Sequence, residues 1–297
     1  MKGLNQLLSA VSRSFYLSMR FLPREMRPGV AVGYLLARAT DTVADTVDMD
    51  CRERLTLLRM MGETAAGDAS RETASTCFGQ LGVLSTVQAH RGEAELLSRF
   101  PECLALLEDL SPREQMLVRN VLSTIVEGQT WDLEYFEGNS SVSCPDQLEH
   151  YTYMVAGCVG EFWTRLGLLV MGADFSTQPE RELLRWGAHY GMGLQLVNIL
   201  RDREEDLARG RSYLPSPDPA PWMAQAERWL KEGVFYAESL RSGRLRFSTV
   251  LPAWLGLDTL ELLQGKERPA SGKVKVTRGR VYARMWKAFL FSWKEAM

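Results

Sequence analysis

A polar stripe in the segment 193–206 holds the residues best suited to chemistry. It consists of four residues at positions i, i+3, i+7 and i+11: Gln195, Asn198, Asp202 and Asp206. At this helical spacing the side chains share one side, while most of their neighbours are apolar. Buried amides and carboxylates need partners, and their hard oxygen atoms suit Mg²⁺ held together with phosphate groups. Arg201 and Arg211 supply cations for phosphate oxygens. A solvated charged face is the alternative interpretation.

A second pair of carboxylates lies earlier in the chain. Asp41 and Asp45 are four residues apart, so a helix stacks them on one face, where like charges repel unless a cation compensates. Arg38 and Tyr34 extend the same stripe. One such pair alone is more often a solvated face. Two pairs on separate helices favour a metal–diphosphate site, where metals and arginines stabilise a departing allylic diphosphate and apolar walls shield the carbocation from water.

Long helices are the elements that must position these residues. Prolines are spaced so that intervals of roughly 30 residues remain free of them, and apolar residues recur at helical spacing within those intervals. The predicted helices cover 29–46, 51–66, 112–136, 146–171, 180–208, 220–242, 245–264 and 278–295. No alternating run predicts a sheet, so the expected class is all-α. The stretch 68–92 is interpreted as either a helix pair or a loop. The proline-rich stretch 212–221 is predicted to be an extended connector, and the sequence leaves open whether it also serves as a lid.

Composition and charge narrow the class of protein. The chain has 297 residues, with 35 Lys and Arg against 37 Asp and Glu, which disfavours bulk binding to nucleic acid. Its five cysteines form no CxxC pair, which is typical of a reducing compartment. We find no secretory signal and no apolar run of the roughly 20 residues that a membrane span needs. The expectation is a cytoplasmic protein with one domain over 1–297.

Five motifs carry a resemblance to the squalene and phytoene synthases, the head-to-head prenyl transferases. They are the SRSF at 12–15, the first aspartate motif at 38–45, the YxxxVAG segment at 151–157, the second aspartate motif at 195–206 and RGRxYLP at 209–215. The resemblance implies an isoprenoid-synthase helical bundle around a central cavity, with the two aspartate helices facing each other across it. A head-to-tail elongase is disfavoured because the adjacent aspartates of its DDxxD motif are absent.

The resemblance also implies roles for individual residues. Mg²⁺, or Mn²⁺ in its place, would be held by Asp41, Asp45, Asn198, Asp202 and Asp206. The catalytic residues would be these four aspartates and Tyr151, which would handle a proton. The substrate would contact Ser12, Arg13, Phe15, Tyr34, Arg38, Gln195, Arg201 and Arg211. Core packing is the alternative for the aromatic residues Phe15, Tyr34 and Tyr151.

The segment 273–280 indicates which product the enzyme would make, because it resembles the VKIxxG stretch near NADPH in squalene synthases. The cofactor would contact Lys275, Arg278, Arg38 and Asn198, although Thr277 stands where some members have arginine. We therefore expect condensation of two farnesyl diphosphates through presqualene diphosphate and reduction with NADPH to squalene. Trp163 would shorten the cavity and favour C15 chains. The alternatives are a non-reducing dehydrosqualene, presqualene diphosphate or phytoene synthase, and a non-catalytic assembly protein on the same fold.

Two further patterns predict surfaces. Gly187, Gly191 and Gly193 form a small-residue pattern that favours close helix packing over nucleotide binding, because no strand precedes it. Near the C-terminus one stripe is aromatic and another is basic: Tyr282, Trp286, Phe289 and Trp293 beside Arg280, Arg284, Lys287 and Lys294. This pattern predicts either peripheral contact with the inner face of a membrane or a terminal helix docked on the core.

Overall fold

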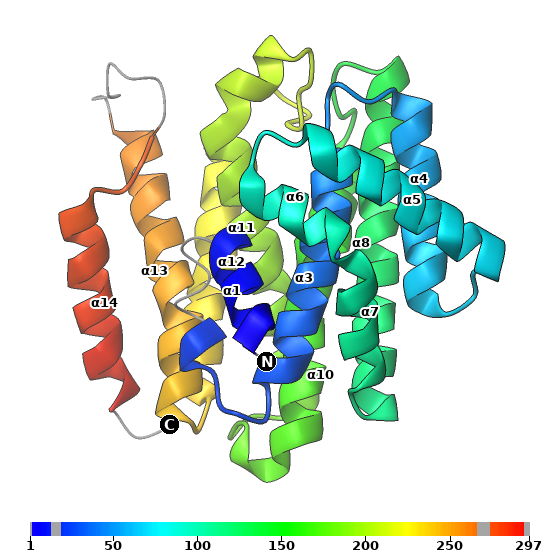
Figure 1. Ribbon diagram of the computed structural model, residues 1–297. Helices are drawn as coiled ribbons and strands as arrows, with labels where there is room; N and C mark the ends of the chain where they lie inside the picture. Colours follow the sequence, from blue (N-terminus) through cyan, green and yellow to red (C-terminus); the bar gives the residue numbers. More distant parts are fainter. Residues whose placement is uncertain (1, 13–18, 266–273, 294–297) are drawn as a thin grey trace. The chain divides into compact units, whose positions relative to one another are not determined.

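The computed structural model describes residues 2–12, 19–265 and 274–293, and within these ranges it contains helices, two isolated β-bridges and no β-strand (Figure 1). The elements are α1 (Lys2–Val11), α3 (Arg27–Ala44), α4 (Cys51–Ala66), α5 (Arg71–Val87), α6 (Arg91–Ser98), α7 (Phe100–Glu108), α8 (Pro112–Gly138), α9 (Pro145–Thr152), the π-helical η1 (Tyr153–Gly157), α10 (Cys158–Met171), the 3₁₀ turn η2 (Gly172–Asp174), α11 (Glu180–Ala208), α12 (Ala220–Ser239), α13 (Gly243–Gln264) and α14 (Arg278–Ser292). The predicted all-α class is confirmed.

The chain divides into two compact units. The first unit comprises Met1–Arg20 and Arg24–Glu137, and the second comprises Phe21–Pro23 and Gly138–Met297. The single domain over 1–297 stays a prediction. The first aspartate motif belongs to the first unit, and the second aspartate motif belongs to the second unit.

In the first unit, α3 carries the first aspartate motif. Pro28 stands in its first turn, where a missing N–H costs nothing. Its apolar side, which includes the fully buried Leu35, Leu36 and Val43, packs against neighbouring helices, among them α4, α6 and α7. This packing holds the helix while the side with Asp41 remains partly accessible.

The stretch 68–92, which the sequence left open between a helix pair and a loop, forms α5 and leads into α6. Ser70 caps α5 by accepting a hydrogen bond from the Thr73 backbone N–H at 3.0 Å. The buried residues of α5 are Cys77, Leu81 and Leu84, a single narrow row. Because one narrow apolar row gives only a weak periodic signal, the helix was hard to recognise from the sequence.

In the second unit, α11 packs against α10, α12 and α13. Glycines let α10 and η1 approach it closely. A Cβ atom at Gly160 would lie 1.8 Å from the carbonyl oxygen of Gly187, and one at Gly191 would lie 2.1 Å from that of Ala156. Both distances are far below any van der Waals contact. The prediction that the glycines of α11 serve close helix packing is therefore confirmed.

The predicted continuous helix 146–171 is interrupted in the structure. The π turn η1 separates α9 from α10, and this changes the angular step between residues before and after it. On an uninterrupted helix the side chains of Tyr151, Val159 and Phe162 would share one face. Tyr151 and Phe162 are buried, but the side chain of Val159 is 39% exposed. The burial pattern expected for an uninterrupted helix is therefore wrong at Val159.

The same region qualifies another expectation. Among the described residues, Pro145–Asp174 is one segment long and apolar enough to cross a bilayer, with a mean hydropathy of 1.3. The sequence predicted no apolar segment long enough to span a bilayer, and by helix length and hydropathy that prediction is wrong. Core helices of soluble bundles pass the same test, and here the segment packs on α11.

Candidate functional site

The polar stripe of α11 lies on the accessible side of that helix. Asn198 is exposed, whereas Gln195, Asp202 and Asp206 are half-buried, and the intervening Leu196 and Ile199 are buried. The Asn198 amide donates to the Gln195 side-chain oxygen at 3.5 Å. The predicted stripe is therefore formed on one helix, but its members are less buried than the sequence indicated.

An arginine pairs with the second motif directly. Arg201 donates two hydrogen bonds to Asp202, from Nε at 3.0 Å and from Nη2 at 2.6 Å. This charge-assisted contact raises the pKa of Arg201 further above its usual value, against the opposing effect of burial. A cation thus already balances one carboxylate of the stripe.

The end of α11 has a defined shape because of Gly210. Its φ of 78° is in the left-handed region, which suits glycine, and the Arg211 backbone N–H returns to the Asp206 carbonyl oxygen at 2.9 Å. Ser212 then exchanges backbone hydrogen bonds with the segment 140–142. The RGRSYLP segment is therefore tied to the helix on one side and to the α8–α9 connection on the other.

Tyr151 joins this segment through its ring. The ring stacks on that of Tyr213 with centroids 5.2 Å apart and planes inclined by 20°, and Tyr151 keeps only 8% of its surface exposed. The structure thereby brings together the YxxxVAG and RGRxYLP segments, which lie about 60 residues apart in the sequence.

The first motif, on α3, contains an ion-pair cluster. Arg38 pairs with Asp41 through Nη1 and with Glu93 of α6 through Nη2, the second at 2.5 Å. Burial and the neighbouring Asp45 raise the pKa of Asp41 to about 7, against the lowering effect of Arg38. The side chain still keeps 42% of its surface accessible, so the carboxylate is open to solvent on one side. A second cation would relieve this repulsion.

Other predicted substrate residues have local roles in the first unit. The Tyr34 hydroxyl donates to the Val11 carbonyl oxygen at 3.2 Å, and the buried Ser12 hydroxyl donates to the Leu8 carbonyl oxygen. Arg13 and Phe15 lie outside the described residues. The Tyr34 contact thus ties α1 to the helix that carries the first motif, whereas the Ser12 contact is made within the end of α1 itself.

The oxygen donors fit Mg²⁺ shared with a diphosphate. Within the described ranges, no group of three or more His, Cys, Asp or Glu side chains is placed to hold a metal ion. Each motif offers two carboxylates on one helical face, and Mg²⁺ is typically bound through one or two carboxylates with phosphate oxygens completing its shell. The donor sets therefore suit a cation that binds with its substrate rather than one enclosed by protein alone.

The predicted cofactor segment reaches the start of α14. Lys275 and Arg278 are exposed, and the Thr277 hydroxyl caps α14 by accepting a hydrogen bond from the Arg280 backbone N–H at 3.3 Å. The capping role gives a local structural reason for threonine at this position. Lys273 lies outside the described residues. Contacts of Lys275, Arg278, Arg38 and Asn198 with a cofactor stay predictions.

Trp163 of α10 is half-buried, and its indole N–H is enclosed without a hydrogen-bond partner among the described residues. A tryptophan here is large enough to fill space that a smaller side chain would leave open. Its effect on chain length stays a prediction.

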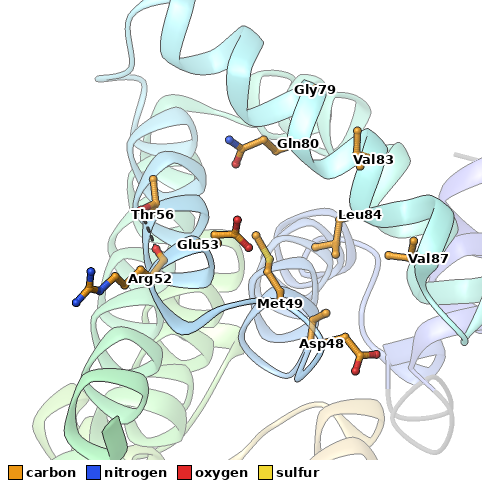
Figure 2. A pocket seen from close by; sticks show the side chains of 11 residues that line it. Asp48, Met49, Arg52, Glu53, Thr56, Gly79, Gln80, Val83, Leu84 and Val87 are labelled. Carbon is orange, nitrogen blue, oxygen red and sulfur yellow. Dashed lines mark hydrogen bonds between the residues drawn. The ribbon is translucent and has the colours of Figure 1, made fainter. Parts of the chain in front are cut away.

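An open groove of about 610 Å³ lies elsewhere, in the first unit between α4 and α5. Figure 2 shows Met49, Leu84 and Val87 along it, with Asp48 and Glu53 among the polar members of its lining. None of the predicted site residues lines this groove. The groove is therefore not the site that the motifs describe.

Sequence reasoning missed three contributors to the site. Tyr213 was part of a recognised motif, yet nothing local indicated its ring partner. Glu93 follows the weakly patterned stretch 68–92 and gave no signal of its pairing with Arg38. Gly210 could have been recognised, since a glycine directly after a long helix is typical of a C-terminal cap.

Comparison with known proteins supports the motif interpretation. The model of the squalene/phytoene synthase family matches residues 8–218. The squalene synthase of Eremothecium gossypii is 26% identical over 94% of this chain and 66% of its own length. The squalene synthase ERG9 of Saccharomyces cerevisiae is 27% identical over 76% of this chain and 48% of its own. The bifunctional lycopene cyclase/phytoene synthase of Phaeosphaeria nodorum is 28% identical over 80% and 37%. The chain thus spans less than two thirds of the length of these curated relatives.

Solved structures show the same fold. TcSQS in complex with the ligand E5700 superposes with a TM-score of 0.75, at 23% identity, over 98% of this chain and 88% of that one. A dehydrosqualene synthase in complex with ligand gives a TM-score of 0.67, at 18% identity, over 98% and 95%. The fold is therefore the all-α isoprenoid-synthase fold. With a family match over residues 8–218, which contain both aspartate motifs, the chain belongs to the squalene/phytoene synthase family.

Proposed function

We propose that this protein condenses two molecules of farnesyl diphosphate head to head through presqualene diphosphate and then reduces that intermediate with NADPH to squalene. The observation that carries the proposal is the polar stripe of α11 together with the RGRSYLP segment that follows it. Gly210 of this segment caps the helix, and the Tyr213 ring stacks on the ring of Tyr151. Family membership supports a prenyl transferase of isoprenoid biosynthesis as the class of enzyme.

In this proposal the oxygen donors of each motif bind Mg²⁺ together with substrate diphosphate. The residues that would hold the cation are Asp41 on α3, Asp45 at the C-cap of α3, and Asn198, Asp202 and Asp206 on α11, with Gln195 supporting Asn198 through their contact. Bound Mg²⁺ supplies Lewis-acid stabilisation of the leaving diphosphate. Mn²⁺ has the same preference for oxygen ligands.

The arginines act by exchanging partners. Arg38 and Arg201 each pair with an aspartate of a motif in the unliganded protein. When that aspartate is engaged by a cation, its arginine becomes available for diphosphate oxygens, which suit the planar guanidinium. Arg211 joins them from the RGRSYLP segment. In the substrate complex, diphosphate oxygens would thus take the place of the aspartate as the partner of each arginine.

Tyr151 handles the proton released as the cyclopropane ring of presqualene diphosphate closes. The stack on Tyr213 fixes the plane of its ring and so the direction of its hydroxyl. A general acid or base needs this positioning more than it needs an unusual pKa. Trp163 favours the C15 chain of farnesyl diphosphate over a C20 chain.

The reduction step is assigned to NADPH with Lys275 and Arg278, exposed on either side of the cap residue Thr277. Arg38 and Asn198 complete the proposed cofactor contacts. The cap role of Thr277 leaves fewer cations for a cofactor phosphate here than an arginine would provide. This observation favours one second candidate, a non-reducing synthase that stops at dehydrosqualene or presqualene diphosphate, or makes phytoene.

The decisive experiment incubates the protein with farnesyl diphosphate and Mg²⁺, with and without NADPH, and identifies products by mass. Squalene that forms only with NADPH is the expected result. Dehydrosqualene in both reactions would support the non-reducing synthase instead. No product in these reactions, or in a parallel incubation with geranylgeranyl diphosphate, would point to the non-catalytic assembly protein. Asp202→Asn should abolish turnover, whereas the matched control Asp174→Asn, on an exposed residue of the second unit, should retain it.

A further inference from the structure

We infer that the outer face of α14 is a docking surface for the interface of an anionic lipid bilayer. This aromatic face consists of Tyr282, Trp286, Phe289, Leu290 and Trp293. At 100° per residue these positions fall within an arc of about 100°, which is a single side of the helix. Trp286 is 64% exposed and Trp293 is 76% exposed. The inference does not depend on the proposed reaction.

The aromatic face is not needed to fold α14 onto its unit. The opposite side of the helix buries Ala288 and Phe291 in a cluster with Phe247, Val250 and Leu251 of α13. Figure 1 shows α14 running alongside α13. Since the core contacts of α14 are made on that side, the exposed rings serve no packing within the described part of the chain.

The exposed rings form a continuous row. Trp286 stacks on Phe289 with centroids 5.8 Å apart, and Phe289 contacts Trp293 at 5.9 Å. Among the described residues, five of the thirteen exposed large hydrophobic side chains belong to this one segment, while the others occur singly or, as with Val83 and Val87 of α5, in a pair. A contiguous exposed patch of this kind marks an interaction surface. Tryptophan and tyrosine in particular favour the boundary between water and lipid.

The charge of α14 identifies the lipid. The helix contains four cations and no acidic residue. Arg280 and Arg284 are neutralised by two carboxylates of α13. The buried Asp258 accepts hydrogen bonds from both arginines, and Glu261 pairs with Arg280. Arg278 and Lys287 are exposed, and neither forms an ion pair within the described ranges. Their charge selects anionic over zwitterionic lipid, and a helix with one aromatic side and flanking cations has the composition of interfacial membrane helices.

A second copy of the chain suits this face less well. A two-fold dimer through the aromatic face would bring two sets of these cations into one interface, and α14 offers no carboxylate to pair with them. An anionic bilayer instead supplies both the negative charge and the apolar depth that the rings require.

The test measures cosedimentation of the full chain with vesicles of phosphatidylglycerol and phosphatidylcholine, and with vesicles of phosphatidylcholine alone. The wild type should bind the anionic vesicles and dissociate as salt rises. The double variant Trp286→Gln with Trp293→Gln should lower the partition coefficient by about tenfold or more. Lys287→Gln should lower it by about fivefold on anionic vesicles only. The control Val83→Gln with Val87→Gln changes two residues of α5 that are similarly exposed, and should bind as the wild type does.

Three results would overturn the inference. The wild type could stay in the supernatant with anionic vesicles, or the double tryptophan variant could sediment as well as the wild type. Light scattering could also show a dimer that the double variant dissociates while vesicles do not bind, which would assign the face to a second copy. None of these readouts requires turnover, so they are separate from a failure of the proposed reaction.

Discussion

Replacement of Asp41 by asparagine tests whether the first aspartate motif stores electrostatic repulsion in the absence of a cation. The carboxylate has a pKa of about 7 in the folded protein, compared with 3.8 for an unperturbed aspartate, a difference of about 3 units. At 1.36 kcal/mol per unit this corresponds to at most about 4 kcal/mol of destabilisation when the group is ionised. Since 42% of the side chain is accessible, solvent screening reduces the expected value to about 1–2 kcal/mol.

Because the pKa is raised by folding, the folded protein binds more protons at Asp41 than the unfolded chain does between the two pKa values. The contribution of Asp41 to stability is therefore greatest below the unfolded pKa and is lost as pH rises through about 7. Asp41→Asn removes this loss. In chelator at about pH 8, the variant should melt roughly 2–4 °C higher than the wild type, and the difference should shrink toward about pH 5.

The measurement is thermal unfolding by differential scanning fluorimetry over this pH range, with Asp68→Asn, on an exposed residue of the same unit, as the control. If the proposed function is correct, Mg²⁺ with a non-hydrolysable diphosphate should stabilise the wild type more than the variant. A variant that melts lower than the wild type at about pH 8 would refute the reasoning, because it would show that Asp41 is satisfied by Arg38 and carries no net repulsion.

Two further substitutions probe the second unit, each compared with a control variant. Gly191→Ala places a methyl group 2.1 Å from the Ala156 carbonyl oxygen and should destabilise the protein by about 3 kcal/mol in urea unfolding. The control Gly79→Ala has no heavy atom within 4 Å of the added Cβ and should stabilise the protein by about 0.5–1 kcal/mol. Equal effects of the two variants would mean that the helices can separate at no cost. Tyr213→Leu removes the ring stack on Tyr151, which is worth about 0.5–1.5 kcal/mol, and should lower kcat about 2–10-fold with little change in KM. The control Tyr213→Phe keeps the stack and should keep kcat. Equal kcat values for the two variants would show that the stack does not contribute to catalysis.

Local sequence information was sufficient for most of the helices. The ranges 51–66 and 180–208 match α4 and α11 because caps, prolines and 3.6-residue periodicity act within a few neighbouring residues. The same local logic placed Asn198, Asp202 and Asp206 on one side of α11. The prediction from local patterns failed at 153–157. There the π turn accompanies close packing of Gly157, in η1, against α11, which carries Gly191, and no local pattern of residues records this constraint.

The sequence by itself determined the all-α class, the two aspartate helices and the family resemblance, since these depend on residue types and their spacing along the chain. Only the tertiary structure decided that Arg38 pairs with Glu93, 55 residues away, and that Tyr151 stacks on Tyr213. It also decided that α14 buries Phe291 and leaves Trp286 and Trp293 outside. The physical reason is that periodicity specifies a helix and its apolar side, whereas the partner of each side chain is set by how distant segments pack together.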